Sequence, residues 1–164
     1  MQAEMIIRPT EPRDVGELCQ LLNEIIEQGG TTARRQTMSE TEFLEHYVTN
    51  PISISCVTAQ AADGTLLGFQ TLHLYDWLPS GWADIGTFAR VGSTAKGIGT
   101  RLFQSTLQAA ADRNISTINA TIRSYNIGGL KYYGKMGFVE YKREEAEPLE
   151  AGQAAEKVFK KRAV

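Results

Sequence analysis

Three glycines stand within eight residues in the segment GSTAKGIGTRLF, residues 92–103, directly before an amphipathic pattern. Glycine is about 1 kcal/mol less favourable than alanine inside a helix, so glycines at a helix entrance indicate that bare backbone is needed there. The first N–H groups of a helix lack intrahelical partners and carry partial positive charge. The segment therefore predicts a site for an anion such as a diphosphate.

Two phosphate-binding patterns were tested on this segment, and neither fits. The P-loop pattern GxxxxGK[ST] aligns with Gly92 and Gly97 but requires a lysine where Ile98 stands. The dinucleotide pattern GxGxxG aligns with Gly97 and Gly99 but finds Leu102 in place of its third glycine. A backbone cradle for a diphosphate and a plain strand-to-helix turn remain equal interpretations of the segment by itself.

A second segment, NIGGLKYYGKMGF at residues 126–138, follows one predicted strand and precedes another. Together the two segments resemble the GNAT superfamily of N-acetyltransferases, which bind acetyl-coenzyme A. The family's cofactor motif, Q/R-x-x-G-x-G/A, matches at Gly97 and Gly99. Its later motif, roughly N-x-x-A-x-x-x-Y-x-x-x-G-F, matches at Asn126, Tyr133, Gly137 and Phe138. The resemblance extends to the predicted order of elements along nearly the whole chain.

The resemblance implies where acetyl-coenzyme A lies, with no metal ion involved. The diphosphate would bind the backbone of residues 95–100, and the pantetheine arm would follow the fourth strand at residues 87–89. Thr94 stands where the family has glutamine or arginine, so backbone or Lys96 must replace that contact. A strand N–H near Phe88 or Ala89 could polarise the thioester carbonyl. The implied cofactor-binding residues are Thr87, Phe88, Ala89, Ala95, Lys96, Gly97, Ile98, Gly99, Thr100, Asn126 and Tyr133.

Tyr133 is, by the same resemblance, the catalytic donor to the leaving thiolate. A phenol with a pKa of about 10 and a thiol near 8.5 make complete proton transfer about 2 kcal/mol uphill. We therefore expect Tyr133 to act by hydrogen bonding, unless its surroundings lower its pKa. A core tyrosine beside Tyr132 is the structural alternative. Asn126 is expected to cap the short helix, with or without contact to the cofactor.

The base that accepts the amine's proton is less clearly marked. Some family members carry a carboxylate five residues before the motif asparagine, but Thr121 occupies that position here. Asp84 on the fourth strand is the catalytic candidate, although strand alternation could equally turn it toward solvent or into a salt bridge. Ordered water bound to backbone is the remaining alternative.

The acceptor-binding residues are expected in segments that the family varies. Arg34, next to Arg35, could clamp a carboxylate, although a solvated basic pair is the commoner role. Trp77 and Trp82 could wall the substrate or form a dimer contact. His46 and His73 belong to no motif and are interpreted as structural.

These residues predict an acetyl-coenzyme A-dependent N-acetyltransferase, which moves an acetyl group to a primary amine of a small molecule such as an amino acid, by direct attack. The alternatives are acetylation of a peptide or protein N-terminus, and a non-catalytic sensor that binds acyl-coenzyme A. The expected partner is the small amine, with no nucleic acid and no membrane, and a homodimer is possible.

Composition agrees with one globular domain over residues 1–164, since 42% of residues are apolar and 22% are charged. The formal charge of −2 provides no global field for nucleic acid or anionic lipid. The chain shows no signal-peptide pattern or long apolar run, so we expect a cytoplasmic protein. Cys19 and Cys56 lack the partners of a metal site.

Hydrophobic periodicity supplies the elements that must position these residues. Strands are predicted at residues 5–8, 52–60, 66–75, 83–89, 115–122, 138–142 and 157–164, the last as an edge strand. Helices are predicted after a Thr10 cap, after a Ser39–Glu42 capping box, and near residues 98–114 and 128–136. This order indicates an α+β fold, a mixed α/β sandwich. By resemblance, the mostly antiparallel central sheet splays at its fourth and fifth strands and is flanked by about four helices.

Overall fold

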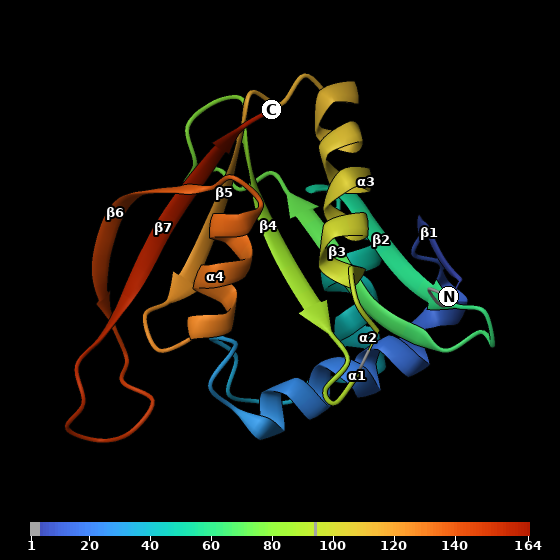
Figure 1. Cartoon of the computed structure of the whole chain (residues 1–164), viewed down its shortest axis with the longest axis horizontal. Helices are drawn as coiled ribbons and strands as arrows, with labels where there is room; N and C mark the ends of the chain where they lie inside the picture. Colours follow the sequence, from blue (N-terminus) through green and yellow to red (C-terminus); the bar gives the residue numbers. More distant parts are fainter. Residues whose placement is uncertain (1–3, 94) are drawn as a thin grey trace.

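The computed structural model describes residues 4–93 and 95–164, which form a seven-stranded sheet flanked by helices (Figure 1). The strand order across the sheet is β1-β2-β3-β4-β5-β7-β6. The strands are β1 (Met5–Pro9), β2 (Ser53–Ala61), β3 (Leu66–His73), β4 (Trp82–Ala89), β5 (Thr117–Arg123), β6 (Val139–Ala146) and β7 (Ala155–Ala163). The helices are α1 (Val15–Gln28), α2 (Glu40–Phe43), α3 (Ile98–Asp112) and α4 (Ile127–Lys135). The predicted α+β class and element order are confirmed.

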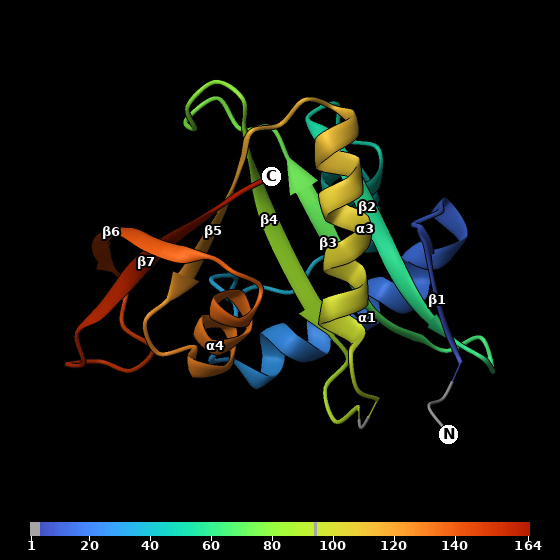
Figure 2. The ribbon, with the colours of Figure 1, turned by 45° about the horizontal axis from the view of Figure 1, so that its top comes forward.

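Within residues 4–93 and 95–164, β4 and β5 form the one parallel pair, and all other strand pairs are antiparallel. The parallel pairing is short, because its register joins only Trp82–Asp84 to Thr117–Asn119. Beyond these residues the two strands diverge toward their carboxyl ends, as both views of the ribbon show (Figures 1 and 2). The predicted splay at the fourth and fifth strands is therefore present.

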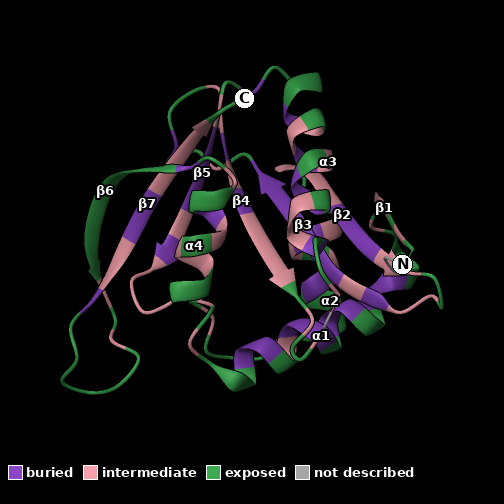
Figure 3. Ribbon diagram, viewed as in Figure 1, coloured by how far each residue is buried: buried purple, intermediate pink, exposed green. Residues whose placement is uncertain are grey.

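The last strand is not at the edge of the sheet, so that prediction was wrong. β7 inserts between β5 and β6 and pairs antiparallel with both. The edge is β6, whose residues are almost all exposed (Figure 3). Its charged sequence, VEYKREEA, is typical of an edge strand that must resist pairing with another chain.

Helices cover the two faces of the sheet in pairs. α1 and α2 bury their apolar residues with Phe69 of β3. On the other face α3 packs on β2 residues such as Val57, and α4 lies over β5 residues such as Ile118. The buried stripe of α1 recurs at the spacing of a helix and includes Leu18, Leu22 and Ile25. The sheet therefore separates two layers, and side chains that alternate along β4 face one layer or the other.

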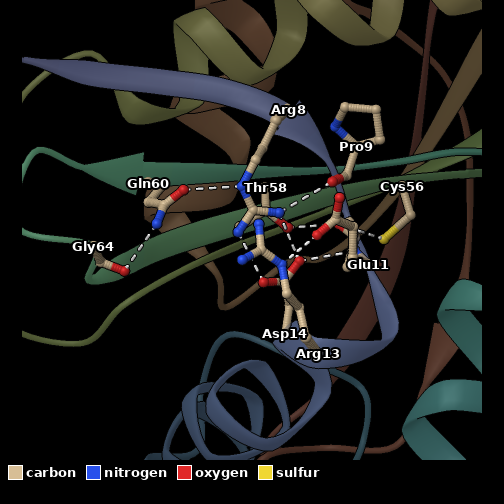
Figure 4. Close-up of polar contacts among 10 residues, drawn as sticks. Arg8, Pro9, Glu11, Arg13, Asp14, Cys56, Thr58, Gln60 and Gly64 are labelled. Carbon is tan, nitrogen blue, oxygen red and sulfur yellow. Dashed lines mark hydrogen bonds and ion pairs between the residues drawn. The ribbon is translucent and has the colours of Figure 1, made fainter.

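The start of α1 differs from the prediction that Thr10 caps it. Thr10 lies before a short 3₁₀ turn and its hydroxyl bonds Thr58 instead. The N–H of Glu11 donates to the carboxylate of Asp14, which is also held by two bonds of 2.7 and 2.8 Å from the Arg8 guanidinium (Figure 4). These bonds lower the pKa of Asp14, chiefly through Arg8. The helix entrance is thus tied to β1 by an ion pair.

The capping box of α2 is confirmed. The Glu42 N–H donates to the Ser39 hydroxyl, and the Ser39 N–H donates to the Glu42 carboxylate, both at 3.1 Å. The helix then continues as a π-helical turn over Leu44–Val48, closed by a bond from the Thr49 N–H to the Leu44 carbonyl. Such turns are frequent at functional sites. The described residues contain no helix with the length and hydrophobicity of a membrane span.

Candidate active site

The gap between β4 and β5 is the central feature of the site. Parallel pairing ends at Asp84, while the other edge of β4 stays paired with β3 as far as Ala89. The backbone of residues 85–89 therefore presents N–H and C=O groups toward the gap. An extended ligand that carries amide groups can pair with such a strand edge. Thr87, Phe88 and Ala89, the predicted cofactor-binding residues of this strand, all lie in this stretch.

Asp84 lies at the point where the strands part, on the face covered by α1 and α2. Its carboxylate accepts a hydrogen bond of 2.8 Å from the side-chain amide of Asn119, its register partner on β5. Burial raises the pKa of Asp84 to about 7, and the bond from Asn119 only partly opposes that rise. Among the described residues Asp84 forms no ion pair. A carboxylate with this pKa can exchange a proton near neutral pH.

The amide of Asn119 is held in one orientation by its other neighbours. Tyr141 of β6 donates its hydroxyl proton to the Asn119 carbonyl oxygen. This leaves the amide nitrogen directed toward Asp84 and toward the Thr121 hydroxyl at 3.1 Å. Thr121, which occupies the family's alternative carboxylate position, thus supports the amide that holds Asp84.

Of the two histidines interpreted as structural, His73 pairs with Asp84 across the strands and His46 contacts His73. His73 is the register partner of Asp84 across β3 and β4, and its ring centroid is 5.4 Å from that of His46. Burial, reinforced by His46, lowers the pKa of His73 to about 4, so His73 is neutral at pH 7. In the described parts of the chain, no group of three or more His, Cys, Asp or Glu side chains could hold a metal ion.

Tyr133 lies on the opposite face of the gap from Asp84. It projects from α4, is buried, and its hydroxyl oxygen is 2.8 Å from the Thr87 hydroxyl. Burial raises the pKa of Tyr133 well above its usual value, while the bond to Thr87 opposes the rise. The surroundings therefore do not make Tyr133 a stronger acid, and they favour a hydrogen-bonding role over complete proton transfer.

Gln70 is a buried polar residue that sequence reasoning missed. It is fully buried on β3, opposite Thr87 in the register, and its amide nitrogen lies 3.0 Å from the Thr87 hydroxyl. A glutamine inside a strand pattern has no motif around it. The signal that could have found it is the hairpin register, which pairs Gln70 with a predicted cofactor-binding residue.

The glycine segment begins α3 as predicted. Gly97 has a φ of +79° at the N-cap, which favours glycine, and Ile98 between the glycines is buried in the core. Among described residues no acceptor is found for the N–H groups of Gly99 and Thr100. These donors, with the exposed Lys96 beside them, fit a diphosphate.

Two details of this segment differ from the prediction that the backbone of residues 95–100 is free to bind a diphosphate. The N–H of Ala95 donates to the Ser93 hydroxyl at 3.3 Å, so the protein already engages that amide. A Cβ on Gly99 would lie 2.5 Å from a ring carbon of Tyr132, so this glycine makes room for a tyrosine of α4. Thr94, the departure from the family motif, lies outside the described residues.

Asn126 caps α4, as predicted. Its side-chain oxygen accepts the Gly129 N–H at 2.9 Å, and its nitrogen donates to the Thr31 carbonyl at 3.1 Å. A Cβ on Gly129 would lie 2.5 Å from that nitrogen, so this chain has glycine where the motif has alanine. Both polar atoms of Asn126 are used inside the protein, so the cap joins α4 to the loop after α1.

Each of the predicted acceptor-binding residues contacts an aromatic side chain. The Arg34 guanidinium lies 5.9 Å from the ring centre of Tyr47, next to His46. The Trp82 ring contacts Tyr141 edge-on at 5.7 Å. Trp77 is 55% exposed and stacks on Tyr75. The guanidinium of the neighbouring Arg35 instead binds the loop before β7, donating to the Pro148 carbonyl at 2.8 Å and pairing with Glu147 at 3.7 Å.

Comparison with known proteins identifies the family of the chain. Residues 18–138 match the model of the acetyltransferase (GNAT) family. The Bacillus subtilis protein YwnH, which carries the name of a phosphinothricin acetyltransferase, is 23% identical over 84% of this chain and 85% of its own.

Solved structures share the fold at low identity. An N-acetyltransferase from Staphylococcus aureus Mu50 superposes with a TM-score of 0.86 at 16% identity, over 98% of this chain and 99% of that one. A phosphinothricin acetyltransferase from Sinorhizobium meliloti, solved with acetyl-coenzyme A, gives 0.85 at 16% identity, over 100% and 89%. The chain belongs to the GNAT family of acetyltransferases and is, as its sequence predicts, an N-acetyltransferase dependent on acetyl-coenzyme A.

Proposed function

We propose that this enzyme acetylates the primary amine of a small molecule, most suitably an amino acid, by direct attack on the thioester. The observation that carries the proposal is the gap between β4 and β5, with a protonatable carboxylate on one face and a buried phenol on the other. An amine that enters beside Asp84 and a thioester that lies along residues 85–89 would meet where the strands part.

Asp84 and Tyr133, on opposite faces of the gap, have different roles in the proton transfers. Acetyl-coenzyme A supplies an acetyl group activated by a thiol leaving group. An alkyl amine with a pKa near 10.4 arrives protonated at pH 7, so it must lose a proton before it attacks. Asp84 accepts that proton before the nitrogen–carbon bond forms. The nitrogen loses a second proton to solvent as the intermediate collapses to the amide, and Tyr133 donates a hydrogen bond to the thiolate that leaves as the carbon–sulfur bond breaks.

The acceptor face supports an amine that also carries a carboxylate. Arg34 provides the cation, and its planar guanidinium suits a carboxylate. The rings of Tyr75, Trp77 and Trp82 provide apolar walls around it. The names of the Bacillus and Sinorhizobium relatives point in the same direction, since phosphinothricin is an amine-bearing amino acid.

A thiol-release screen tests the substrate class. The enzyme is mixed with acetyl-coenzyme A and with amino acids, polyamines, aminoglycosides or peptides in turn, and free coenzyme A is measured. We expect the highest kcat/KM among amino acids, and we expect Arg34→Met to raise KM for the amino acid more than for an amine without a carboxylate. A preference for peptides, or no release with any acceptor while coenzyme A binds, would contradict the proposal.

Coenzyme A alone should stabilise the folded enzyme. At about 100 times its Kd a ligand adds about 2.7 kcal/mol, which corresponds to a rise in Tm of about 5–10 °C for a domain of this size. Thermal melts with increasing coenzyme A measure the shift, and adenosine at equal concentration is the control. An unchanged Tm at millimolar coenzyme A would contradict a diphosphate site at residues 95–100.

A further inference from the structure

A continuous row of hydrogen bonds joins the first turn of α3 to the phenol of Tyr133. The Tyr132 hydroxyl donates to the Gly99 carbonyl at 2.7 Å. The Gln70 amide nitrogen donates to the Tyr132 oxygen at 3.1 Å and to the Thr87 oxygen at 3.0 Å. The Thr87 hydroxyl lies 2.8 Å from that of Tyr133. The row crosses α3, α4, β3 and β4, and Gln70 at its centre is fully buried.

The direction of the first bonds follows from the number of protons available. Tyr132 has one hydroxyl proton, and the Gly99 carbonyl can only accept, so that proton lies on the bond to Gly99. The Tyr132 oxygen is left as an acceptor, and the atom of Gln70 that faces it must be the amide nitrogen. The reverse orientation would set two oxygens against each other. Among described residues the Gln70 carbonyl oxygen has no partner, so the donors alone decide how the amide is turned.

Either hydroxyl could donate in the last bond, between Thr87 and Tyr133, so its direction depends on which acceptors the two protons have when the leaving sulfur lies in the gap. The Thr87 oxygen already accepts a proton from Gln70, and the part of the chain that the structure describes offers its own proton no acceptor except Tyr133. If Tyr133 donated to Thr87, the Thr87 proton would be left unbonded and the leaving sulfur would receive no hydrogen bond. With Thr87 as the donor to Tyr133 and the sulfur in the gap as the acceptor of the Tyr133 proton, both hydroxyl protons are bonded.

We propose that Gln70 and Thr87 are positioning residues, which make Thr87 the hydrogen-bond donor to Tyr133 and so leave the Tyr133 proton free to face the gap. This inference rests on the proposed role of Tyr133 beside the leaving sulfur. It also assigns a purpose to Gly99, because the row begins at its carbonyl and needs the space that its missing side chain provides.

Kinetics of matched variants test the row. Thr87→Val removes the hydroxyl at nearly constant shape, and Gln70→Met removes the amide. Each should lower kcat about tenfold, because a Tyr133 proton that points away from the sulfur loses part of its effect on the rate, while KM for acetyl-coenzyme A stays within about twofold. Thr87→Ser, which keeps the hydroxyl, should recover most of the loss. Full activity in both Thr87→Val and Gln70→Met would overturn the inference.

The same variants made in a Tyr133→Phe background separate positioning from a general structural effect. If Gln70 and Thr87 act only through the Tyr133 proton, neither change should lower kcat further once that proton is gone. A further tenfold loss in the double variants would overturn the inference. Full activity of Tyr133→Phe itself would overturn the proposed role of Tyr133 and this inference together, so the two failures are distinguishable.

A measurement without turnover gives an independent readout. The ultraviolet absorbance of the thiolate reports the pKa of the thiol of coenzyme A bound to the enzyme. A free Tyr133 proton stabilises the thiolate, so we expect a thiol pKa lower in the wild-type complex than in Gln70→Met or Thr87→Val, by about one unit. Equal thiol pKa values in the three complexes would overturn the inference.

Discussion

Replacing Asp84 with asparagine should remove most of the acetyl transfer and, above pH 7, make the folded protein more stable. Loss of a general base typically lowers kcat by about 10²- to 10⁴-fold. Asparagine fills the same space and can still bond Asn119, but it has no charge to bury. A change that harms catalysis and helps stability would distinguish a functional carboxylate from a structural one.

The sign of the stability effect follows from the pKa of Asp84, which is raised to about 7 in the folded state. The unfolded carboxyl titrates near 3.9, so the folded state binds more protons between these values and stability falls as pH rises through that window. Above pH 7 the buried charge destabilises the fold by about 2–4 kcal/mol. The advantage of Asp84→Asn should therefore be absent below about pH 4 and complete above about pH 8.

Chemical denaturation at pH 4, 6 and 8.5 measures this window, and Asp112→Asn, at the exposed end of α3, is the matched control. The wild-type kcat should also rise with pH through about 7, as Asp84 loses its proton and can act as a base. Wild-type turnover in Asp84→Asn would show that water, rather than this carboxylate, accepts the amine's proton. Lower stability of Asp84→Asn at pH 8.5 would show that burial of the charge is compensated elsewhere.

Local patterns in the sequence were enough to predict the elements of the site. The Ser39 capping box, the glycine at the start of α3 and the asparagine cap of α4 all depend on residues within one turn of each other. Their physical causes are local, since each supplies a donor, an acceptor or a positive φ at a helix end. Element order followed from hydrophobic periodicity, whereas the splay at the fourth and fifth strands was predicted from the resemblance to the family.

Contacts made across strands could not be predicted in this way. The insertion of β7 between β5 and β6 depends on pairing between distant segments, so the last strand was placed at the edge. His73 and Gln70 look like ordinary strand residues until β3 is set in register against β4, where they face Asp84 and Thr87. A one-residue slip would send each to the other face, so only the register reveals them.

Replacing Tyr133 with phenylalanine should lower kcat about 100-fold and leave KM for acetyl-coenzyme A nearly unchanged. The ring still packs against Phe138 and Tyr132, so the loss is confined to one hydroxyl group and its bond to Thr87. Unfolding free energy should fall by only about 1 kcal/mol, the usual worth of such a bond.

The pH dependence of Tyr133→Phe separates hydrogen bonding from proton transfer. Burial holds the pKa of Tyr133 far above its usual value, so the phenol stays protonated and wild-type kcat should show no fall from its ionisation up to pH 9.5. The variant should then be slower by a constant factor across pH 7–9.5, measured by thiol release with Tyr125→Phe as the control. If the wild-type rate fell steeply near pH 8 and the difference between the wild type and Tyr133→Phe shrank over the same range, the phenol would ionise near pH 8 and act by proton transfer. Equal rates for the wild type and Tyr133→Phe would exclude Tyr133 from the chemistry, leaving solvent to stabilise the thiolate.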